Sequence, residues 1–241
     1  MKIIAHRGYK AIFPENTVLS FLKAVEYGAD GIELDVRMSS DNIPVIVHDP
    51  FILDKADPKN AFIISETNLE TLKKISLGMN QAIPTLREVL ESINKNTFID
   101  LEFKVHNAVS PSIELLKYFG FKNLMFSSFE RKLLKNLKED FPSAVIGLLY
   151  EVYELEEINQ LYDFLISELR NYNADFLNLP IEFFRDKVYF LRIIEKLKKA
   201  GVKVSFWTVN ELKDLNLVKD ITDILITDKV ELMIKHIKLN G

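Results

Sequence analysis

The sequence predicts an α/β fold of the (β/α)₈ TIM-barrel class. Short apolar runs alternate with amphipathic segments from one end of the chain to the other, as strands alternate with helices in such a fold. Eight strand-like runs are present, and nearly all are separated by a helix-like segment. The length of 241 residues suits one such barrel. An open doubly wound sheet is the alternative, but no Gly-x-Gly-x-x-Gly turn follows the first apolar run.

The predicted strands are short apolar runs that end where polar or turn-forming residues begin. In chain order they span residues 2–5, 31–36, 97–103, 123–126, 144–149, 174–179, 202–206 and 223–226. A further extended segment, 44–47, comes shortly after the second strand. Residues 49–64 follow neither period, and we interpret them as a loop or a small insertion.

The predicted helices are segments whose apolar residues recur at helical spacing. Asn16 or Thr17 can cap the first of them, and Thr85 and Glu88 have the spacing of a capping box. In chain order the helices span residues 18–27, 68–76, 84–93, 109–119, 130–140, 154–172, 187–200, 211–218 and 230–238.

Composition narrows the functional class. No linker, low-complexity tract or charge block marks a boundary, so residues 1–241 are expected to form a single domain with a short insertion after the second strand. The net charge of -4 argues against nucleic acid as the main partner. The chain has no cysteine, so any metal must bind oxygen or imidazole ligands. No run is long enough for a signal peptide or a membrane span, which predicts a cytoplasmic protein without stable membrane association.

Two acidic residues on the second predicted strand need an explanation. Glu33 and Asp35 alternate with Ile32, Leu34 and Val36, so both carboxylates lie on one face of the strand. Neighbouring acids repel each other and resist burial, and a bivalent cation between them relieves both costs. The alternative is a half-exposed strand with two solvated acids.

Polar residues collect where the predicted strands end, which is the catalytic end of a (β/α)₈ barrel. Each alone has an ordinary structural explanation, but independent accidents would not all fall at one barrel mouth. His106 and His236 are interpreted as a loop residue and a surface residue. The residues of the predicted mouth are His6, Glu33, Asp35, His48, Asp49, Glu102, Lys104, Ser127, Ser128, Asn178, Trp207, Asn210, Thr227 and Asp228.

This set favours the cleavage of a phosphodiester. Glu33, Asp35 and Glu102 form an oxygen-rich site suited to Mg²⁺ or Ca²⁺. The two histidines of the set can act as general acid and general base near neutral pH. Arg7 and Lys104 supply positive charge for an anionic substrate. Neither a cysteine nucleophile nor a Gly-x-Ser-x-Gly elbow is present.

At these residues the chain resembles the glycerophosphodiester phosphodiesterase family. The matching pieces run in the family's order through nearly the whole chain, so the set is specific although each piece alone is weak. They are His6-Arg7-Gly8, Pro14-Glu15-Asn16-Thr17, Glu33-Leu34-Asp35, His48-Asp49, Ile83-Pro84-Thr85-Leu86, Glu102-Phe103-Lys104, Ser127-Ser128-Phe129, Trp207-Thr208-Val209-Asn210 and Thr227-Asp228.

The resemblance implies a phospholipase-C-like phosphodiesterase barrel that hydrolyses glycerophosphodiesters to sn-glycerol 3-phosphate and an alcohol. It implies one divalent cation (Mg²⁺ or Ca²⁺, with Mn²⁺ also open) held by Glu33, Asp35 and Glu102. It also implies that His6 and His48 form the acid–base pair. The expected partner is therefore a small-molecule diester.

The resemblance assigns further residues to the substrate. Arg7 and Lys104 would contact the phosphate, and Trp207 would line the substrate site. Glu15 and Asn16 would support the site from the loop after the first strand. After His48-Asp49 the family usually shows a Leu-x-Arg-Thr-like sequence, whereas this chain has 50–56 as Pro-Phe-Ile-Leu-Asp-Lys-Ala. That region shapes the alcohol side of the family's pocket.

Several alternatives stay open at this point. The substrate is a lysophospholipid or glycerophosphoinositol in one alternative, and in another the barrel binds a phosphate ester without catalysis. The attacking oxygen belongs either to water or to the substrate's own glycerol hydroxyl. The sequence assigns neither histidine as the acid, and it leaves a homo-oligomer open.

Overall fold

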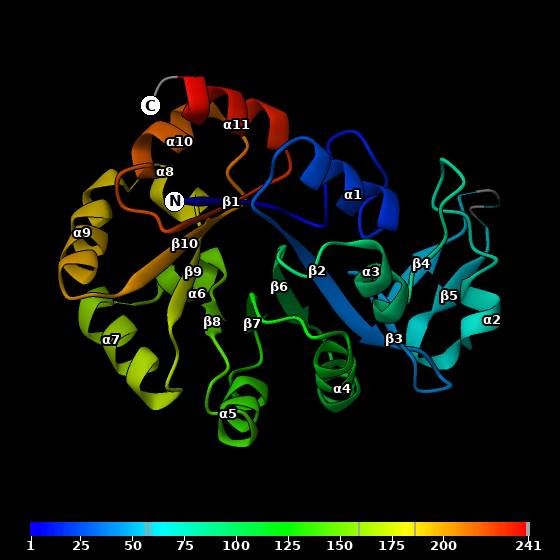
Figure 1. The fold of residues 1–241 in the computed structure, drawn as a ribbon. Helices are drawn as coiled ribbons and strands as arrows, with labels where there is room; N and C mark the ends of the chain where they lie inside the picture. The colour runs from blue at the N-terminus through cyan, green and yellow to red at the C-terminus, as the bar shows by residue number, and fades with distance from the viewer. Residues whose placement is uncertain (56, 58, 159, 186, 240–241) are drawn as a thin grey trace.

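The protein is a closed eight-stranded parallel barrel with helices between the strands, seen in a computed structural model that describes residues 1–55, 57, 59–158, 160–185 and 187–239 (Figure 1). β1 pairs in parallel with both β11 and β2, and this closes the barrel. The predicted fold class is confirmed. The barrel strands are β1 (Lys2–Ala5), β2 (Gly31–Met38), β6 (Phe98–Phe103), β7 (Leu124–Ser128), β8 (Ile146–Leu149), β9 (Phe176–Pro180), β10 (Lys203–Trp207) and β11 (Ile224–Thr227).

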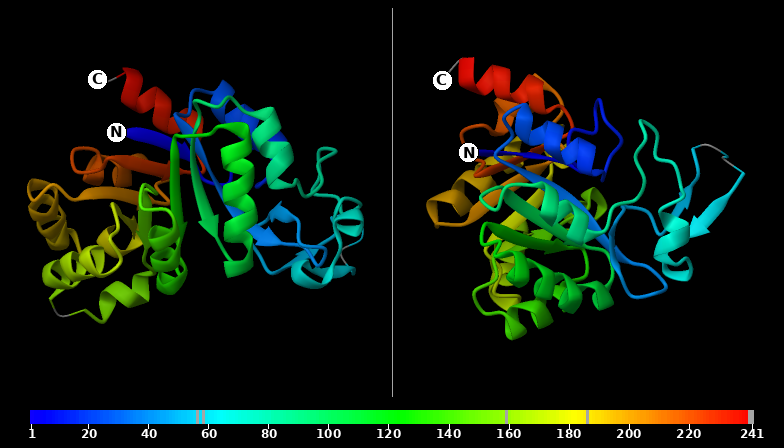
Figure 2. Two further views of the ribbon diagram at one scale, coloured as in Figure 1. Left: turned by 60° about the horizontal axis from the view of Figure 1, so that its bottom comes forward. Right: turned by 45° about the vertical axis from the view of Figure 1, so that its right-hand side comes forward.

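Helices surround the barrel and cover the outer faces of its strands (Figures 1 and 2). The capping box of Thr85 and Glu88 is present, and Thr17 rather than Asn16 caps the first helix. No helix in the described ranges is long and apolar enough to cross a membrane. The helices are α1 (Val18–Glu26), α2 (Leu69–Leu72), α3 (Leu86–Ser92), α4 (Val109–Phe119), α5 (Arg131–Asp140), α6 (Val152–Glu156), α7 (Leu161–Asn171), α8 (Glu182–Arg185), α9 (Leu191–Lys199), α10 (Leu212–Val218) and α11 (Val230–Leu239), with 3₁₀ turns η1 (Ile64–Glu66), η2 (His106–Ala108) and η3 (Val188–Phe190).

Three predicted helices differ from the observed ones. In place of the helix predicted at 154–172 the structure has two helices, α6 and α7, and α6 begins two residues earlier, at Val152. The predicted span includes Asn159, which lies outside the described residues. Leu155 and Leu161 are both buried, although residues six apart point about 120° away from each other on one continuous helix, so a break lets both reach the core. The helix predicted at 187–200 begins at Leu191 and is preceded by α8 and η3, and the one predicted at 68–76 is reduced to α2.

The stretch predicted as irregular, 49–64, contains a β-hairpin. β4 (Phe51–Leu53) and β5 (Ala61–Ile63) pair antiparallel, and β3 (Pro44–Ile46) extends the barrel sheet by pairing antiparallel with the end of β2. These strands and α2 form an insertion that stands to one side of the barrel (Figure 2). A separate small core holds the insertion together; its buried residues are Val45, Val47, Ile64, Leu72, Ile75, Leu77 and Ile83.

The two faces of each barrel strand explain where polar residues are tolerated. The outer side chains of β2 (Ile32, Leu34 and Val36) belong to the core between strands and helices. The inner positions of the same strand are Gly31, Glu33 and Asp35, because side chains alternate along a strand. The lower barrel interior is filled by a separate apolar cluster of Ile4, Met125, Phe176, Ile224 and Ile226. The polar residues therefore sit above an apolar plug, at the carboxyl end of the barrel.

Candidate active site

A cavity of about 220 Å³ opens at the carboxyl ends of the barrel strands. Most of the predicted site residues line it, and they come from strands far apart in the sequence. Asp35 is the exception among the predicted ligands and lies fully buried behind the wall. The lining residues are His6, Arg7, Glu33, His48, Asp100, Glu102, Lys104, Ser127, Phe129, Leu149, Glu151, Trp207 and Ile226.

Three carboxylates converge beside this cavity. Glu33 and Asp35 come from β2, and Glu102 comes from β6, where it stands opposite Asp35 in the parallel register. One oxygen atom of each carboxylate lies within 4.8 Å of one oxygen of the others. The exposed fractions are only 3%, 0% and 8%, so the alternative of two solvated acids is wrong.

The chemistry of this cluster suits a hard cation. Among the described residues, Glu33 Oε1 has no hydrogen-bond partner although it is buried. A buried acceptor without a donor is costly, and a cation removes that cost. Divalent cations such as Mg²⁺ and Ca²⁺ prefer carboxylate oxygens as ligands. The residues present therefore fit a divalent cation.

Burial governs the protonation of these acids. It raises the pKa of Glu33 well above its usual range, and the negative charges of Asp35 and Glu102 raise it further. It likewise raises the pKa of Glu102 to about 7. Burial also acts on Asp35, but the Lys104 and Arg7 cations outweigh it and lower the pKa of that carboxyl. Asp35 is thus the member of the cluster that stays ionised, because two cations flank it.

The two predicted phosphate-binding residues hold Asp35 between them. Lys104 Nζ lies 3.1 Å from Asp35 Oδ1 and also hydrogen-bonds Glu102. Arg7 Nε lies 3.3 Å from Asp35 Oδ2. The backbone of Arg7 has a φ of 54°, and its N–H donates to Glu33 Oε2 at 2.8 Å. The positively charged side chains of Lys104 and Arg7 are therefore held at the edge of the acidic cluster.

The two supporting residues predicted in the loop after β1 contact this cluster from outside. Asn16 Nδ2 donates to Asp35 Oδ2 at 2.8 Å, and Asn16 Oδ1 accepts from the Asp35 backbone N–H at 3.3 Å. Asn16 is buried with a φ of 55°. Glu15 accepts a hydrogen bond from Arg7 at 3.0 Å. Asn16 thus orients Asp35, and Glu15 orients Arg7.

His6 is held by a carboxylate on its Nδ1 side. Nδ1 lies 2.8 Å from Asp228 Oδ1, and Asn210 Nδ2 donates to the other oxygen of Asp228 at 2.7 Å. A carboxylate at Nδ1 favours the tautomer that carries its proton there, which leaves Nε2 as the basic nitrogen. Burial lowers the pKa of His6 from 6.5, and the hydrogen bond to Asp228 partly opposes this shift. His6 is thus neutral and oriented near pH 7.

His48 has a similar arrangement at the other side of the cavity. Its Nδ1 lies 2.7 Å from Asp49 Oδ1, and its backbone carbonyl accepts from Arg37 Nε at 2.7 Å. Burial lowers the pKa of His48, while the Asp35 charge opposes the shift. Both histidines therefore have a carboxylate at Nδ1, which leaves Nε2 as the nitrogen for chemistry.

An aromatic wall completes the cavity. Trp207 and Phe129 meet edge to face with ring centroids 6.0 Å apart. Trp207 Nε1 donates to the Asn178 carbonyl at 3.1 Å, which fixes the indole plane. Lys104 Nζ lies 5.8 Å from the Phe129 ring centroid. The indole thus presents an apolar surface to the cavity.

Asn178 and Ser128, both expected at the mouth, lie inside the protein instead. Asn178 is fully buried, and neither polar atom of its amide has a partner among the described residues. The Ser128 hydroxyl donates to the Phe103 carbonyl at 2.8 Å. Both side chains are therefore withdrawn from the cavity. His106 lies in η2, where its Nε2 is 3.4 Å from Asn136 Nδ2.

Asp100 is a member of the cavity that the sequence prediction missed. Its side chain lies on the inner face of β6, two residues before Glu102, and it accepts a hydrogen bond from Ser127 at 2.7 Å. Burial raises the pKa of Asp100 to about 8. The period of two along β6 is the signal that would have found it.

These raised pKa values predict a pH-dependent stability of the metal-free protein. In the folded state Asp100 and Glu102 hold protons up to about pH 8 and 7, whereas the unfolded chain releases them near pH 4. The folded state thus binds more protons between these limits, and its stability falls as pH rises through 7 and 8. Thermal melting in chelator from pH 6 to 9 should show a falling Tm.

The Asp100→Asn variant is the control, because it removes one titrating group and keeps an acceptor for Ser127. Its melting temperature should fall less over the same pH range. Added divalent cation should restore the wild-type Tm most at pH 9, where the carboxylates are ionised. A Tm in chelator that stays flat or rises from pH 6 to 9 would contradict the buried, protonated state of these acids.

A (β/α)₈ barrel with an acidic cluster, two oriented histidines and two cations at its mouth has the features of a phosphoric diester hydrolase. A profile of the Glycerophosphoryl diester phosphodiesterase family matches residues 6–232. A glycerophosphodiester phosphodiesterase of Caldanaerobacter subterraneus subsp. tengcongensis is 32% identical over 99% of this chain and 98% of its own length.

Solved structures agree with this assignment. A glycerophosphodiester phosphodiesterase of Thermotoga maritima aligns with a TM-score of 0.83 and 31% identity, covering 98% of both chains. An Oleispira antarctica phosphodiesterase, solved in complex with the product sn-glycerol-3-phosphate, aligns with a TM-score of 0.85 and 27% identity over 99% of this chain and 97% of its own. The chain belongs to the glycerophosphoryl diester phosphodiesterase family, and it is a phosphoric diester hydrolase.

Proposed function

We propose that this enzyme hydrolyses glycerophosphodiesters to sn-glycerol 3-phosphate and an alcohol, with the help of one divalent cation. The observation that carries the proposal is the convergence of three buried carboxylates and two carboxylate-oriented histidines on one small cavity. The product complex of the Oleispira antarctica relative supports the same product here.

Glu33, Asp35 and Glu102 would hold the cation, which is Mg²⁺ or Ca²⁺, or else Mn²⁺. When bound, it supplies positive charge that stabilises the negative charge growing on the phosphoryl oxygens. The ammonium of Lys104 and the guanidinium of Arg7 bind the same oxygens from the edge of the cluster. Asp35 already orients the side chains of Lys104 and Arg7, so these side chains need little further ordering when substrate binds.

The two histidines move protons in this scheme. Nε2 of the neutral histidine takes the proton from the attacking oxygen. The other histidine enters the step as an imidazolium, and its Nε2 gives a proton to the leaving alkoxide. Asp228 and Asp49 hold the imidazoles in the orientation for this work and stabilise each ring while it is charged. The Trp207 indole packs against the bound substrate, and Glu15 and Asn16 hold Arg7 and Asp35 in place.

Lysophospholipids and glycerophosphoinositol would use the same cation and histidines, so substrate profiling distinguishes them. The complete set of three acids and two histidines argues against a barrel that only binds phosphate esters. A composition without cysteine fits a reducing compartment, and we place the enzyme in the cytoplasm. We propose that it acts there as a single-domain protein on a small molecule.

A substrate panel tests the proposal. The protein is incubated with glycerophosphocholine, glycerophosphoethanolamine, glycerophosphoinositol and lysophosphatidylcholine, with Mg²⁺, Mn²⁺, Ca²⁺ or chelator. The released phosphomonoester is measured, which is glycerol 3-phosphate from the three deacylated diesters and lysophosphatidate from lysophosphatidylcholine. Turnover of at least one deacylated diester with cation, and its loss in chelator, is the expected result. Full activity in excess chelator would overturn the role of the cation, and release from none of the diesters with any cation would overturn the proposal.

A further inference from the structure

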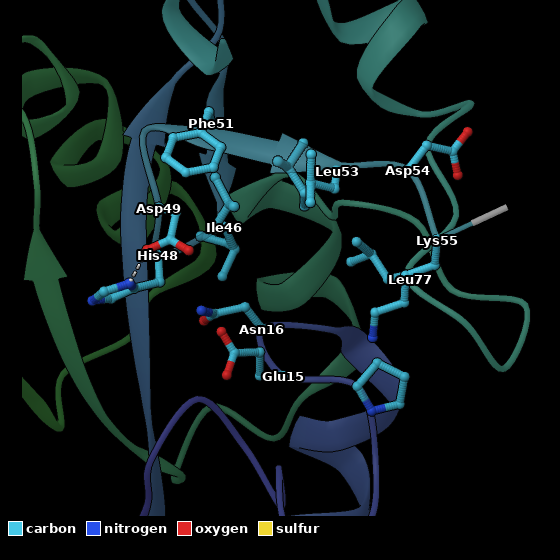
Figure 3. Close-up of a pocket in the computed structure, with 13 residues that line it drawn as sticks. Glu15, Asn16, Ile46, His48, Asp49, Phe51, Leu53, Asp54, Lys55 and Leu77 are labelled. Atoms are coloured by element: carbon cyan, nitrogen blue, oxygen red, sulfur yellow. Dashed lines mark hydrogen bonds and ion pairs between the residues drawn. The ribbon is translucent and has the colours of Figure 1, made fainter. Parts of the chain in front are cut away.

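A second and larger cavity, of about 440 Å³, lies between the insertion and the barrel mouth (Figure 3). His48 lines both this cavity and the smaller one, so the two adjoin at a proposed catalytic residue. Its walls include Ile46, Phe51, Leu53 and Leu77. Anything that extends from the reacting phosphate past His48 therefore enters a space with apolar walls.

The hairpin of the insertion has two apolar faces, and only one of them packs on the core of the insertion. In the pairing of β4 with β5, Ile52 stands opposite Phe62, and both pack on the small core of the insertion. The residues between them point to the opposite face, because side chains alternate. That face carries Phe51, Leu53 and Ile63, with exposed fractions of 51%, 48% and 47%.

The loops around the opening are also apolar at exposed positions. The loop between β1 and α1 and the loop between α2 and α3 project at the same end of the molecule as the hairpin (Figure 2, right). Ile12 in the first loop is 50% exposed, and Met79 in the second is 59% exposed. Exposed apolar residues that gather at one end of a protein, beside a cavity with apolar walls, favour a binding surface there.

The acids of the larger cavity already have partners. Glu15 accepts from Arg7, and Asp49 is bonded to His48. Asp54 accepts from the Ser76 backbone N–H at 3.2 Å. These carboxylates serve the protein itself. Apart from Lys55, which supplies a positive charge at the cavity, the walls that are left for a ligand are mainly apolar.

We propose that the larger cavity and the exposed hairpin face bind the alcohol part of the substrate, and that this alcohol carries an apolar chain. This inference rests on the proposed function. Glycerol phosphate is the part common to all substrates of that reaction, and the smaller cavity, with Arg7 and Lys104, suits a small anionic group. The variable alcohol then extends past His48 onto Phe51 and Leu53.

A series of diesters tests the chain directly. The ethyl, butyl and octyl esters of glycerol phosphate are compared at concentrations below micelle formation. We expect kcat/KM to rise at least about tenfold from butyl to octyl. Full burial of the four added CH₂ groups would give about 200-fold, and on a half-exposed surface only part of each group leaves water. In the double variant with Phe51→Ser and Leu53→Ser, this chain-length dependence should be lost. Both side chains are half exposed, so the change leaves the core intact.

The matched control is Tyr118→Ser on α4, which removes an aromatic ring that is 76% exposed outside the insertion. It should keep the full chain-length dependence. A binding measurement is independent of turnover: 1-octanol titrated into the protein should give saturable NMR shifts of hairpin amides in the wild type and not in the double variant.

The outcomes separate this inference from the proposed function. If glycerophosphocholine is hydrolysed but the octyl and ethyl esters have equal kcat/KM, the apolar alcohol site is wrong and the function stands. If a chain increases kcat/KM only when it is attached to the glycerol, as in lysophosphatidylcholine, the assignment to the alcohol is wrong. If no diester is hydrolysed, the function fails, and octanol binding at the hairpin alone decides whether an apolar site exists.

Discussion

Replacement of His6 or His48 by alanine is expected to lower kcat for glycerophosphodiester hydrolysis by about 10²–10⁴-fold, the usual contribution of a positioned general acid or base. Each ring is oriented by a carboxylate at Nδ1 and lines the cavity beside the acidic cluster. The loss should fall mainly on kcat, because Arg7 and Lys104, which are proposed to bind the phosphate, are unchanged.

The control for this experiment is His106→Ala. His106 lies in η2, and neither cavity of the proposed substrate site includes it among its lining residues. Its loss should leave kcat within about twofold of the wild type. Steady-state rates and thermal melting are measured for all three variants. A variant of His6 or His48 that is folded and retains wild-type turnover would remove that residue from the mechanism.

A better leaving group distinguishes the acid from the base. A nitrophenyl ester of glycerol phosphate releases a weakly basic oxygen, so it needs little help from a general acid. The histidine that protonates the leaving alkoxide should therefore show a much smaller loss with this ester than with glycerophosphocholine. His48 adjoins the cavity proposed for the alcohol, so His48 is expected to show the smaller loss. A smaller loss in His6→Ala would reverse the assignment.

The acidic cluster could be predicted from sequence because the period of a strand and the pairing of neighbouring strands determine it. Glu33 and Asp35 share a strand face by the period of two, and parallel pairing of β2 with β6 places Glu102 opposite Asp35. The barrel fold then determines where these acids lie, because the carboxyl ends of all its strands meet at one mouth. Local pattern and fold class together therefore determine this part of the site.

Contacts between distant side chains could not be predicted in the same way. The sequence marks Asn210 and Asp228 as polar residues after strands, but their hydrogen bonds to each other and to His6 depend on how the loops fold. Asn178 shows the converse error, since it lies in the middle of β9 on the same inner face as Phe176 and is fully buried. Position along a strand gives a side chain's face, whereas its partners depend on tertiary packing.

The hairpin was missed for a different reason. Its strands, Phe51–Leu53 and Ala61–Ile63, are each three residues long, too short for an alternating pattern to be recognised. They form a sheet because Ile52 and Phe62 pack on the small core of the insertion. Tertiary contacts, not local propensity, stabilise this part of the chain.

The Glu33→Gln variant is expected to lose cation binding and, with it, most of the activity. The substitution keeps the size of the side chain and removes the negative charge that this carboxylate can carry. The other two acids of the cluster are unchanged. Glu33 Oε2 accepts from the Arg7 backbone N–H, and the amide oxygen of glutamine can replace that acceptor. The amide nitrogen then takes the position of Oε1, which has no partner among the described residues. A hydrogen-bond donor thus replaces a possible cation ligand at that position.

Isothermal titration with Mg²⁺, Mn²⁺ and Ca²⁺ measures the effect apart from catalysis. Loss of one anionic ligand from a three-carboxylate site should weaken cation binding by at least tenfold, because ligand charge sets affinity in such sites. Activity at a fixed low cation concentration should fall further than activity at saturating cation. The variant should also melt higher than the wild type in chelator at alkaline pH, because burial and the neighbouring acids oppose ionisation of the Glu33 carboxyl and glutamine has no charge to bury.

The control is Glu151→Gln, which changes a carboxylate of the same cavity that lies outside the three-acid cluster. Its backbone N–H donates to Glu154 Oε2 at 2.6 Å, and the substitution leaves that hydrogen bond in place. Cation affinity should then stay within about twofold of the wild type. If both variants bind the cation equally well, or if Glu33→Gln binds it as tightly as the wild type, the cation is not held by this cluster. The charge of Glu33 would then need another role, since burial already opposes its ionisation.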